Sequence, residues 1–213
     1  SVVCSDASGD FSPTSRSVLS VLSGRWDVNF PSERVASRHP GDIADRSRLP
    51  RVLRKGGYHT VADMMGGRWG EVFFEKKYVT EFDEHVQPGP TCKEQVDWLR
   101  KFVAGDSRNE PFFVWMHIFD THTPLQHPEV AESLKGRPKD DYAAAIRHVD
   151  GCVGAAIAAL RDAGLWDRTL FAFFADHGEA LGEHRRTLKH STCYLHDVHV
   201  PLMFHLPGAR ARR

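Results

Sequence analysis

The sequence lacks several features that would assign it to a simple class of protein. Its four cysteines include no Cys-x-x-Cys pair, so they indicate neither a zinc ribbon nor a disulfide framework. No apolar run approaches the roughly 20 residues of a membrane-spanning helix. Basic and acidic side chains balance at 28 each, so no strong field of one sign favours nucleic acid or an anionic membrane. We therefore expect no nucleic-acid partner and no membrane span within these residues.

The chain has the length of one medium-sized domain, at 213 residues. It begins at Ser1 with a strand-like Val2-Val3-Cys4 and stops on a basic run just after Pro207-Gly208. Neither end is typical of a domain boundary. We interpret residues 1–213 as one partial domain, an internal fragment, for which localisation and oligomeric state stay open.

Apolar patterns predict helices that alternate with strands. Helices are expected where apolar residues recur every three or four positions and a glycine follows. The expected helices span 15–23, 49–55, 93–103 and 140–163, and the expected strands span 58–62, 111–119, 168–174 and 200–206. This alternation predicts an α/β fold, with a mostly parallel sheet sandwiched by helices. Residues 26–47 and 66–90 are expected to be irregular.

Polar residues follow two of the expected strands. Asp176 and His177 come directly after the apolar run 169–174, and His122 follows the strand 111–119. Short apolar runs without alternation predict strands that are buried on both faces, and ligands bind at the carboxyl ends of such strands. A carboxylate oxygen and an imidazole nitrogen suit a divalent metal, so we predict that Asp176 and His177 are ligands. An acidic turn that binds nothing is the alternative.

Five motifs occur in a fixed order along the chain. They are Leu53 to Thr60, His117 to Leu125, Tyr142 to Asp150, Asp176 to His184, and Lys189 to Leu202. Together they resemble the sulfatase branch of the alkaline phosphatase superfamily, which carries LxxxGYxT, HxxDxHxPY, YxxAIxxVD, SDHGExLGEH and H/K…Y…VPL elements in this order. The resemblance implies an alkaline-phosphatase-like α/β domain without its first strand.

The resemblance also implies a metal-dependent hydrolase of sulfate or phosphate esters. Its substrate would be a small-molecule, glycan or lipid ester, and its cofactor a divalent ion, with calcium first and manganese or zinc as alternatives. The family's first acidic metal ligands would precede Ser1, so the fragment alone is expected to be inactive. The alternatives are a phosphoethanolamine or phosphoglycerol transferase of the same superfamily and a non-catalytic protein that keeps the fold.

The family places its nucleophile shortly before a segment that resembles residues 21–25, Val-Leu-Ser-Gly-Arg. An ungapped count back from this segment predicts Thr14, with Ser12, Ser15 or Ser17 if the register shifts. The formylglycine motif C/S-x-P-x-R is not matched here, so we expect an unmodified hydroxyl activated by metal contact. A helix cap is the alternative role of this residue.

The resemblance places further cations at the ester. His122 would hold the sulfate or phosphate oxygens or protonate the leaving group. His190, or the adjacent Lys189, would stabilise the anion. His117, earlier on its strand, is expected to be buried. We also expect the strands at 112–119 and 169–174, which precede His122 and Asp176, to be parallel neighbours or near neighbours, with both residues at the same sheet edge.

Overall fold

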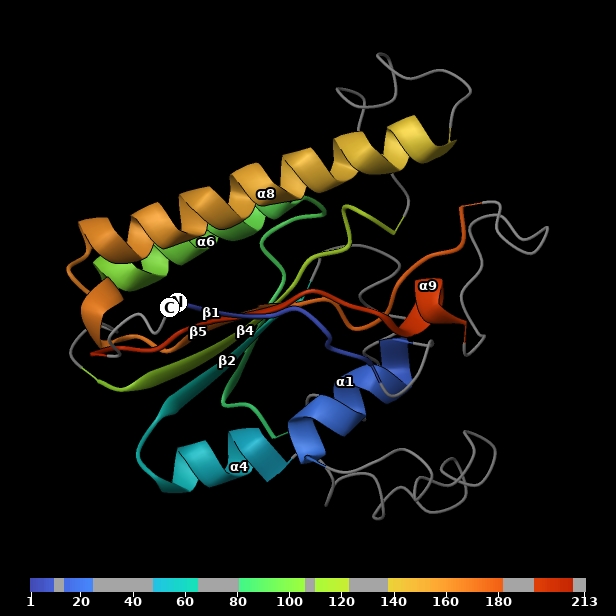
Figure 1. Ribbon diagram of the computed structural model, residues 1–213. Coiled ribbons are helices and arrows are strands. Elements are labelled where there is room, and N and C mark those ends of the chain that lie inside the picture. Colours follow the sequence, from blue (N-terminus) through green and yellow to red (C-terminus); the bar gives the residue numbers. More distant parts are fainter. Residues whose placement is uncertain are drawn as a thin grey trace. The chain divides into compact units, whose positions relative to one another are not determined.

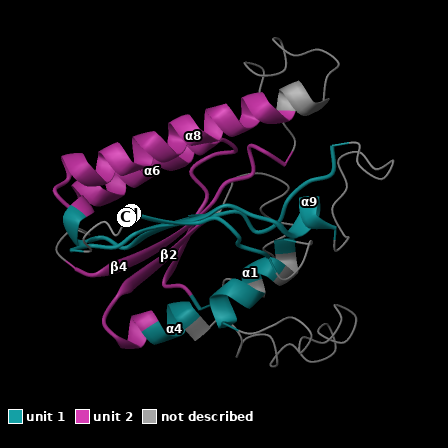
Figure 2. Ribbon diagram, in the orientation of Figure 1, with its two compact units in different colours: residues 1–52, 76–81, 167–213 teal, residues 53–75, 82–166 magenta. Residues whose placement is uncertain are grey.

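The structure is a computed structural model in which residues 1–9, 14–24, 48–64, 81–105, 110–122, 138–181 and 194–208 are described (Figure 1). The chain divides into two compact units (Figure 2). The first unit comprises residues 1–52, 76–81 and 167–213, and the second comprises residues 53–75 and 82–166. Each unit contains one three-stranded sheet in its described part. That the chain forms a single catalytic domain stays a prediction.

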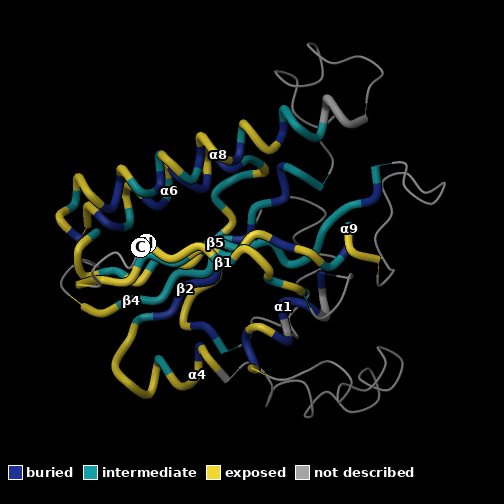
Figure 3. The backbone as a smooth tube through the Cα atoms, in the orientation of Figure 1, coloured by how far each residue is buried: buried dark blue, intermediate teal, exposed yellow. Residues whose placement is uncertain are grey.

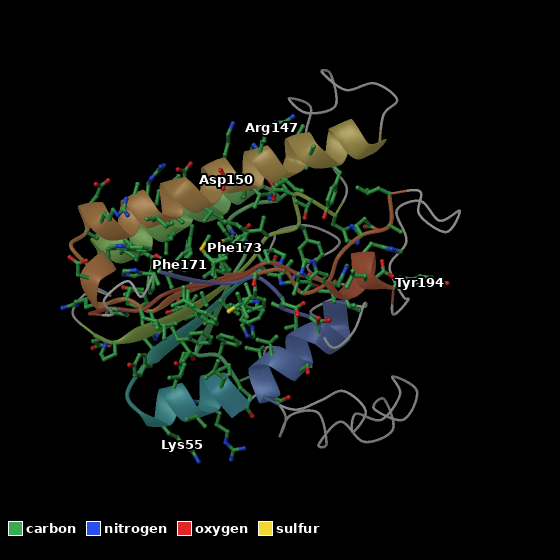
Figure 4. The ribbon with its side chains drawn as sticks, viewed as in Figure 1. Lys55, Arg147, Asp150, Phe171, Phe173 and Tyr194 are labelled. Carbon is green, nitrogen blue, oxygen red and sulfur yellow. A yellow bond between two sulfur atoms is a disulfide. The ribbon has the colours of Figure 1, made fainter. Side chains whose placement is uncertain are left out.

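The first unit contains an antiparallel sheet of order β1-β6-β5. Its strands are β1 (Val2–Cys4), β5 (Phe171–Phe174) and β6 (Leu202–His205). Phe174 pairs with Leu202, and Val2 pairs with Phe204. Phe171 and Phe173 extend to the same side of β5, as alternate residues of a strand must (Figure 4). Strand β5 ends at Phe174, so Asp176 and His177 follow the carboxyl end of this strand after one residue.

Two helices of the first unit flank the candidate site along the chain, α1 (Thr14–Ser23) and α9 (Leu195–Val198). On α1, Val18 and Leu22 lie one turn apart and are both buried. The helix ends at Gly24, whose φ of 64° is the left-handed conformation that favours glycine after a helix. The Gly24 N–H donates to the Ser20 carbonyl at 2.8 Å. The helix predicted at 15–23 is thus confirmed.

The second unit contains a parallel sheet of order β3-β2-β4. Its strands are β2 (His59–Met64), β3 (Glu84–Val86) and β4 (Phe112–His117). Its long helices are α6 (Cys92–Ala104) and α8 (Pro138–Asp162). Two shorter helices, α4 (Arg48–Lys55) and η4 (Trp166–Arg168), continue along the chain from one unit into the other. Helices and a parallel sheet confirm the α/β class.

Helices α6 and α8 run side by side (Figure 1). The face of α8 turned to α6 is buried and its outer face, with Arg147 and Asp150, is exposed (Figures 3 and 4). A disulfide joins Cys92 of α6 to Cys152 of α8. The sequence predicted no disulfide framework, so this disulfide is a correction. It was missed because residues 60 positions apart carry no local pairing signal.

Part of α8, Tyr142–Asp162, is long and apolar enough to cross a membrane by length and composition. We expected no membrane span because the sequence has no long uninterrupted apolar run. This helix instead carries a few polar residues among many alanines and glycines, so it does not form such a run. Its buried face packs against α6, as a core helix does.

Three features of the strands differ from expectation. β4 and β5 are largely half-buried rather than buried on both faces, since each is an outer strand of a three-stranded sheet. β4 pairs with β2 and β5 pairs with β6, so the described residues show no pairing between them. β3 lies in a segment expected to be irregular, because three residues are too few to show a period.

We predict that Thr91→Ala lowers the free energy of unfolding by about 1 kcal/mol. Thr91 caps α6 in a capping box, in which its side chain accepts from the Glu94 N–H and Glu94 accepts from the Thr91 N–H at 3.0 Å. Thr91→Ser, which keeps the hydroxyl, is the matched control and should lose much less. Urea unfolding measures both, and equal losses would contradict the capping role.

Candidate functional site

The Thr14 hydroxyl lies against the imidazole of His177. Thr14 is the first residue of α1 and is buried, and its Oγ1 lies 3.1 Å from His177 Nε2. Nδ1 of the same ring lies 2.7 Å from the Gly178 carbonyl oxygen, which can only accept a hydrogen bond. Nδ1 of the neutral ring therefore carries the proton, and the Nε2 lone pair faces the Thr14 hydroxyl, which donates to it.

Asp176 brings a carboxylate to the same place. Its Oδ2 lies 3.6 Å from His177 Nε2. This oxygen is buried and makes no hydrogen bond to the part of the chain that the structure describes. A buried carboxylate oxygen without a donor is costly unless a cation or a proton meets it. Oxygen from Asp176, nitrogen from His177 and oxygen from Thr14 form a donor set that fits a divalent metal ion.

The backbone after β5 is held by the segment that includes α9. The Gly178 N–H donates to the Asp197 carbonyl at 2.7 Å, and a Cβ at position 178 would collide with the His196 carbonyl oxygen. Gly9 also packs closely, though less tightly, because a Cβ there would lie 3.0 Å from the Asp176 carbonyl oxygen. Glycine at both positions thus allows three backbone segments to approach closely enough to fix Asp176.

The sequence assigned no role to the pair next to this contact, His196 and Asp197. Asp197 is fully buried, and its Oδ1 lies 3.5 Å from His196 Nε2. A His-Asp pair a few residues before the strand β6 was the available signal. The pair supports the chain against which Gly178 packs.

In the second unit, Asp120 and His122 follow β4. Both carboxylate oxygens of Asp120 lie 3.1 Å from the Cys92 N–H nitrogen, and one of them lies 3.3 Å from His148 Nε2. The His122 N–H donates to the Phe119 carbonyl at 2.8 Å, which closes a turn directly after Asp120. The carboxylate of Asp120 thus ties this turn to the start of α6.

His117 is buried, as expected, and Asp63 was missed. Asp63 is fully buried at the end of β2, and its Oδ1 accepts from Gln95 Nε2 at 3.1 Å. The same amide nitrogen donates to the His117 carbonyl at 3.0 Å. Burial raises the pKa of Asp63 to about 7, and the Gln95 hydrogen bond only partly opposes this. An aspartate within the apolar strand His59 to Met64 was the available signal.

The structure thus brings Thr14, Asp176 and His177 together within one unit. His122 belongs to the other unit, so a common sheet edge for His122 and Asp176 stays a prediction. Lys189, His190 and Ser12 lie outside the described residues, as does the side chain of Ser15. Ser17 is buried on α1.

We predict that Gly178→Ala destabilises the loop after β5 by about 3 kcal/mol and weakens metal binding, because the added methyl meets backbone rather than a mobile side chain. The matched control is Gly154→Ala on α8, where a Cβ meets nothing within 4 Å. That variant should gain up to about 1 kcal/mol. Unfolding measurements and metal analysis test both, and similar behaviour of the two variants would refute the packing argument.

The Asp63 carboxyl should make stability depend on pH. Its pKa in the folded chain lies above the unfolded value of about 3.9, so the native state holds the proton more tightly. The resulting cost is absent below pH 4, grows as the pH rises to 7, and reaches about 4 kcal/mol.

Asp63→Asn should remove this cost, and its advantage over the parent should therefore appear between pH 4 and 7. Urea unfolding with a chelator present measures the difference, with the exposed Asp97→Asn as control. A pH-independent difference would show that Asp63 does not titrate in this range.

Comparison with known proteins shows clear relatives. The family model Sulfatase matches residues 2–213. Human iduronate 2-sulfatase is 43% identical over 73 residues, 34% of this chain and 13% of that protein. Zebrafish arylsulfatase K is 30% identical over 131 residues, 58% of this chain and 24% of that protein. The chain thus spans a quarter or less of these two relatives.

The fold is that of the alkaline phosphatase superfamily. The crystal structure of the lipoteichoic acid synthase LtaP from Listeria monocytogenes is similar with a TM-score of 0.76. The likeness covers 99% of this chain and 58% of that one at 17% sequence identity, and so concerns the fold alone. Because the family model covers nearly the whole chain, the chain belongs to the sulfatase family.

Proposed function

We propose that the protein is a metal-dependent hydrolase of sulfate esters, in which the Thr14 hydroxyl is the nucleophile. The observation that carries the proposal is the convergence of Thr14 Oγ1, His177 Nε2 and the Asp176 carboxylate, whose Oδ2 makes no hydrogen bond to the described residues. Iduronate 2-sulfatase and arylsulfatase K support sulfate as the transferred group. Sulfated glycans and other sulfate esters are the substrate class to test first.

Members of this family generally bind a divalent metal ion. In this chain Asp176 and His177 would hold it, and we propose calcium, with manganese and zinc as alternatives. Such an ion would supply Lewis-acid polarisation of the ester oxygen and would lower the pKa of a bound hydroxyl. The Nε2 lone pair of His177 accepts from Thr14 here, and the same lone pair is the one that a metal would use.

Thr14 is well placed to attack a tetrahedral anion. It is the first residue of α1, where the backbone N–H groups of the first turn have no partner within the helix and favour negative charge. In the reaction, Thr14 Oγ1 forms a bond to sulfur and gives up its proton to solvent, while the bond from sulfur to the alcohol oxygen breaks and the alcohol leaves protonated. Water then attacks the sulfur of the Thr14 sulfate ester, which releases sulfate and restores the hydroxyl. The roles of His122 as proton donor and of His190 or Lys189 as anion-stabilising cations rest on the family resemblance.

A second candidate is transfer of a phosphoryl-bearing group to an acceptor alcohol. The observation that favours it is a threonine, rather than cysteine or serine, at the site of the nucleophile. Phosphorus and sulfur esters present the same tetrahedral anion, so one Thr14 site could serve both. The products formed with and without an acceptor alcohol distinguish transfer from hydrolysis.

We predict that Thr14→Ala in the full-length protein lowers kcat by about 10³-fold or more, because it removes the atom that bonds to sulfur. The assay uses 4-nitrophenyl sulfate and 4-nitrophenyl phosphate, with calcium, manganese and zinc supplied separately. Thr14→Ala should still bind the metal through Asp176 and His177, although it loses one oxygen donor, whereas Asp176→Asn should lose the metal. Thr14→Ser keeps a hydroxyl and should retain measurable turnover.

Intact-protein mass spectrometry should find no formylglycine between Cys4 and Ser17. Normal turnover in Thr14→Ala together with its loss in Ser12→Ala or Ser15→Ala would move the nucleophile by one or two residues. Normal turnover in all three variants would exclude the direct-hydroxyl mechanism. No turnover of either ester by the parent protein would favour a non-catalytic role.

A further inference from the structure

Two cysteines and a histidine meet where α6 begins beside α8 (Figure 1). Cys92 is the first residue of α6, whereas His148 and Cys152 lie on α8. One potential ligand atom from each of the three residues lies within 4.8 Å of the other two. All three belong to the second unit and play no part in the site around Thr14.

Two of the three residues are brought together by the period of a single helix. His148 and Cys152 are four residues apart, so a helix presents them on one face, one turn from each other. That face is turned to α6, where Cys92 and Cys152 are buried and His148 is half-buried. The packing of α6 against α8 therefore adds Cys92 to His148 and Cys152, and no local sequence motif predicts this group of three.

The donors in this group are those of a zinc site. Two sulfurs and an imidazole nitrogen favour zinc over calcium or magnesium, which prefer oxygen. Zinc–sulfur bonds of about 2.3 Å place two thiolates roughly 3.8 Å apart in a tetrahedral site. The Cα atoms of Cys92 and Cys152 are 6.0 Å apart, which leaves room for such an arrangement. Cys92 also stands at a helix N-terminus, which favours the thiolate form.

A buried carboxylate completes the surroundings of the histidine. Asp120 Oδ1 lies 3.3 Å from His148 Nε2, and the Asp120 side chain is almost fully buried. A carboxylate on one ring nitrogen is the usual partner of a zinc-bound histidine, because it fixes the ring and makes the other nitrogen more basic. If Asp120 takes this role, Nδ1 of His148 would be the nitrogen that binds the ion.

We propose that Cys92, Cys152 and His148 bind one zinc ion when the protein is reduced, and that the Cys92–Cys152 disulfide replaces this zinc site when it is oxidised. A dithiol reductant supplies two electrons and two protons, which convert the disulfide into two thiols while the reductant becomes a disulfide. Zinc binding then releases the thiol protons. The two states are mutually exclusive, since the sulfurs cannot bond to each other and both ligate the ion.

Both states hold the start of α6 against α8. The Cys92 N–H therefore remains where Asp120 accepts from it, two residues before His122. The proposed zinc site would let the same chain keep this arrangement in reducing and in oxidising compartments. This inference does not depend on the proposed ester hydrolysis.

The test uses the full-length protein, reduced by a phosphine without oxygen, with Co²⁺ as a spectroscopic probe and Zn²⁺ as competitor. If the native disulfide resists reduction, the protein is refolded with reductant and Co²⁺. We expect one equivalent of Co²⁺ with a thiolate charge-transfer band in the near ultraviolet, which Zn²⁺ abolishes. The oxidised protein should show no such band.

Variants separate this site from other metal sites. The double variant Cys92→Ser, Cys152→Ser should lose the band, whereas Cys4→Ser and Asp176→Asn should keep it. Competition with a chromophoric chelator should show zinc affinity lowered about 10–100-fold by Asp120→Asn, which keeps all three ligands. His148→Ala, which removes one, should lower it further.

Circular dichroism establishes that each variant is folded. A folded, reduced parent protein without the thiolate band in either preparation overturns the proposal. A band that persists in the double cysteine variant, or an unchanged zinc affinity in folded His148→Ala, overturns it equally.

Discussion

The candidate site depends on one hydrogen bond, from the Thr14 hydroxyl to His177 Nε2, which joins residues 163 positions apart. Thr14 is held because the apolar face of α1 is buried. His177 is held at its other nitrogen by the Gly178 carbonyl, which settles which nitrogen faces Thr14. Gly178 in turn must be glycine, because it packs on the His196 carbonyl. The direction of the His177 lone pair therefore depends on three features of the fold. They are the buried face of α1, the end of β5, and the close approach of Gly178 to the His196 carbonyl.

Asp63, which is fully buried, and Asp176, which is only partly buried, respond differently to a carboxylate oxygen that lacks a hydrogen-bond donor. Each has an oxygen that makes no hydrogen bond to the described residues. Asp63 accepts from an amide, Gln95, and burial raises its pKa to about 7, so it holds a proton up to about that pH. Asp176 Oδ2 lies 3.6 Å from His177 Nε2, whose lone pair faces the Thr14 hydroxyl, and a bound cation would satisfy this group of electron donors. Asp63 is thus a structural carboxyl, whereas the neighbours of Asp176 support its proposed role as a metal ligand.

The sequence predicted those parts of the fold and site whose causes are local. The helices at α1, α4, α6 and α8 follow from apolar period and glycine ends, and Asp176-His177 directly follows its strand. The antiparallel pairing of β5 with β6 could not be read, because alternation of helices and strands does not state which strands pair. The partners of Asp120 and the Cys92–Cys152 disulfide were missed for a related reason. They arise from packing between elements far apart in sequence, for which one chain offers no pattern.

The two units use the start of a helix in different ways. At α6 the first N–H group, that of Cys92, already donates to Asp120, so an internal carboxylate occupies the anion position that a helix N-terminus offers. At α1 the first residue, Thr14, instead carries a hydroxyl that donates to His177 Nε2, and Asp176 Oδ2 lies 3.6 Å from the same nitrogen. The contact at α6 is structural, because the Asp120 carboxylate joins the turn after β4 to the start of α6. Under the proposed function, the start of α1 would receive the anion of an incoming sulfate or phosphate ester.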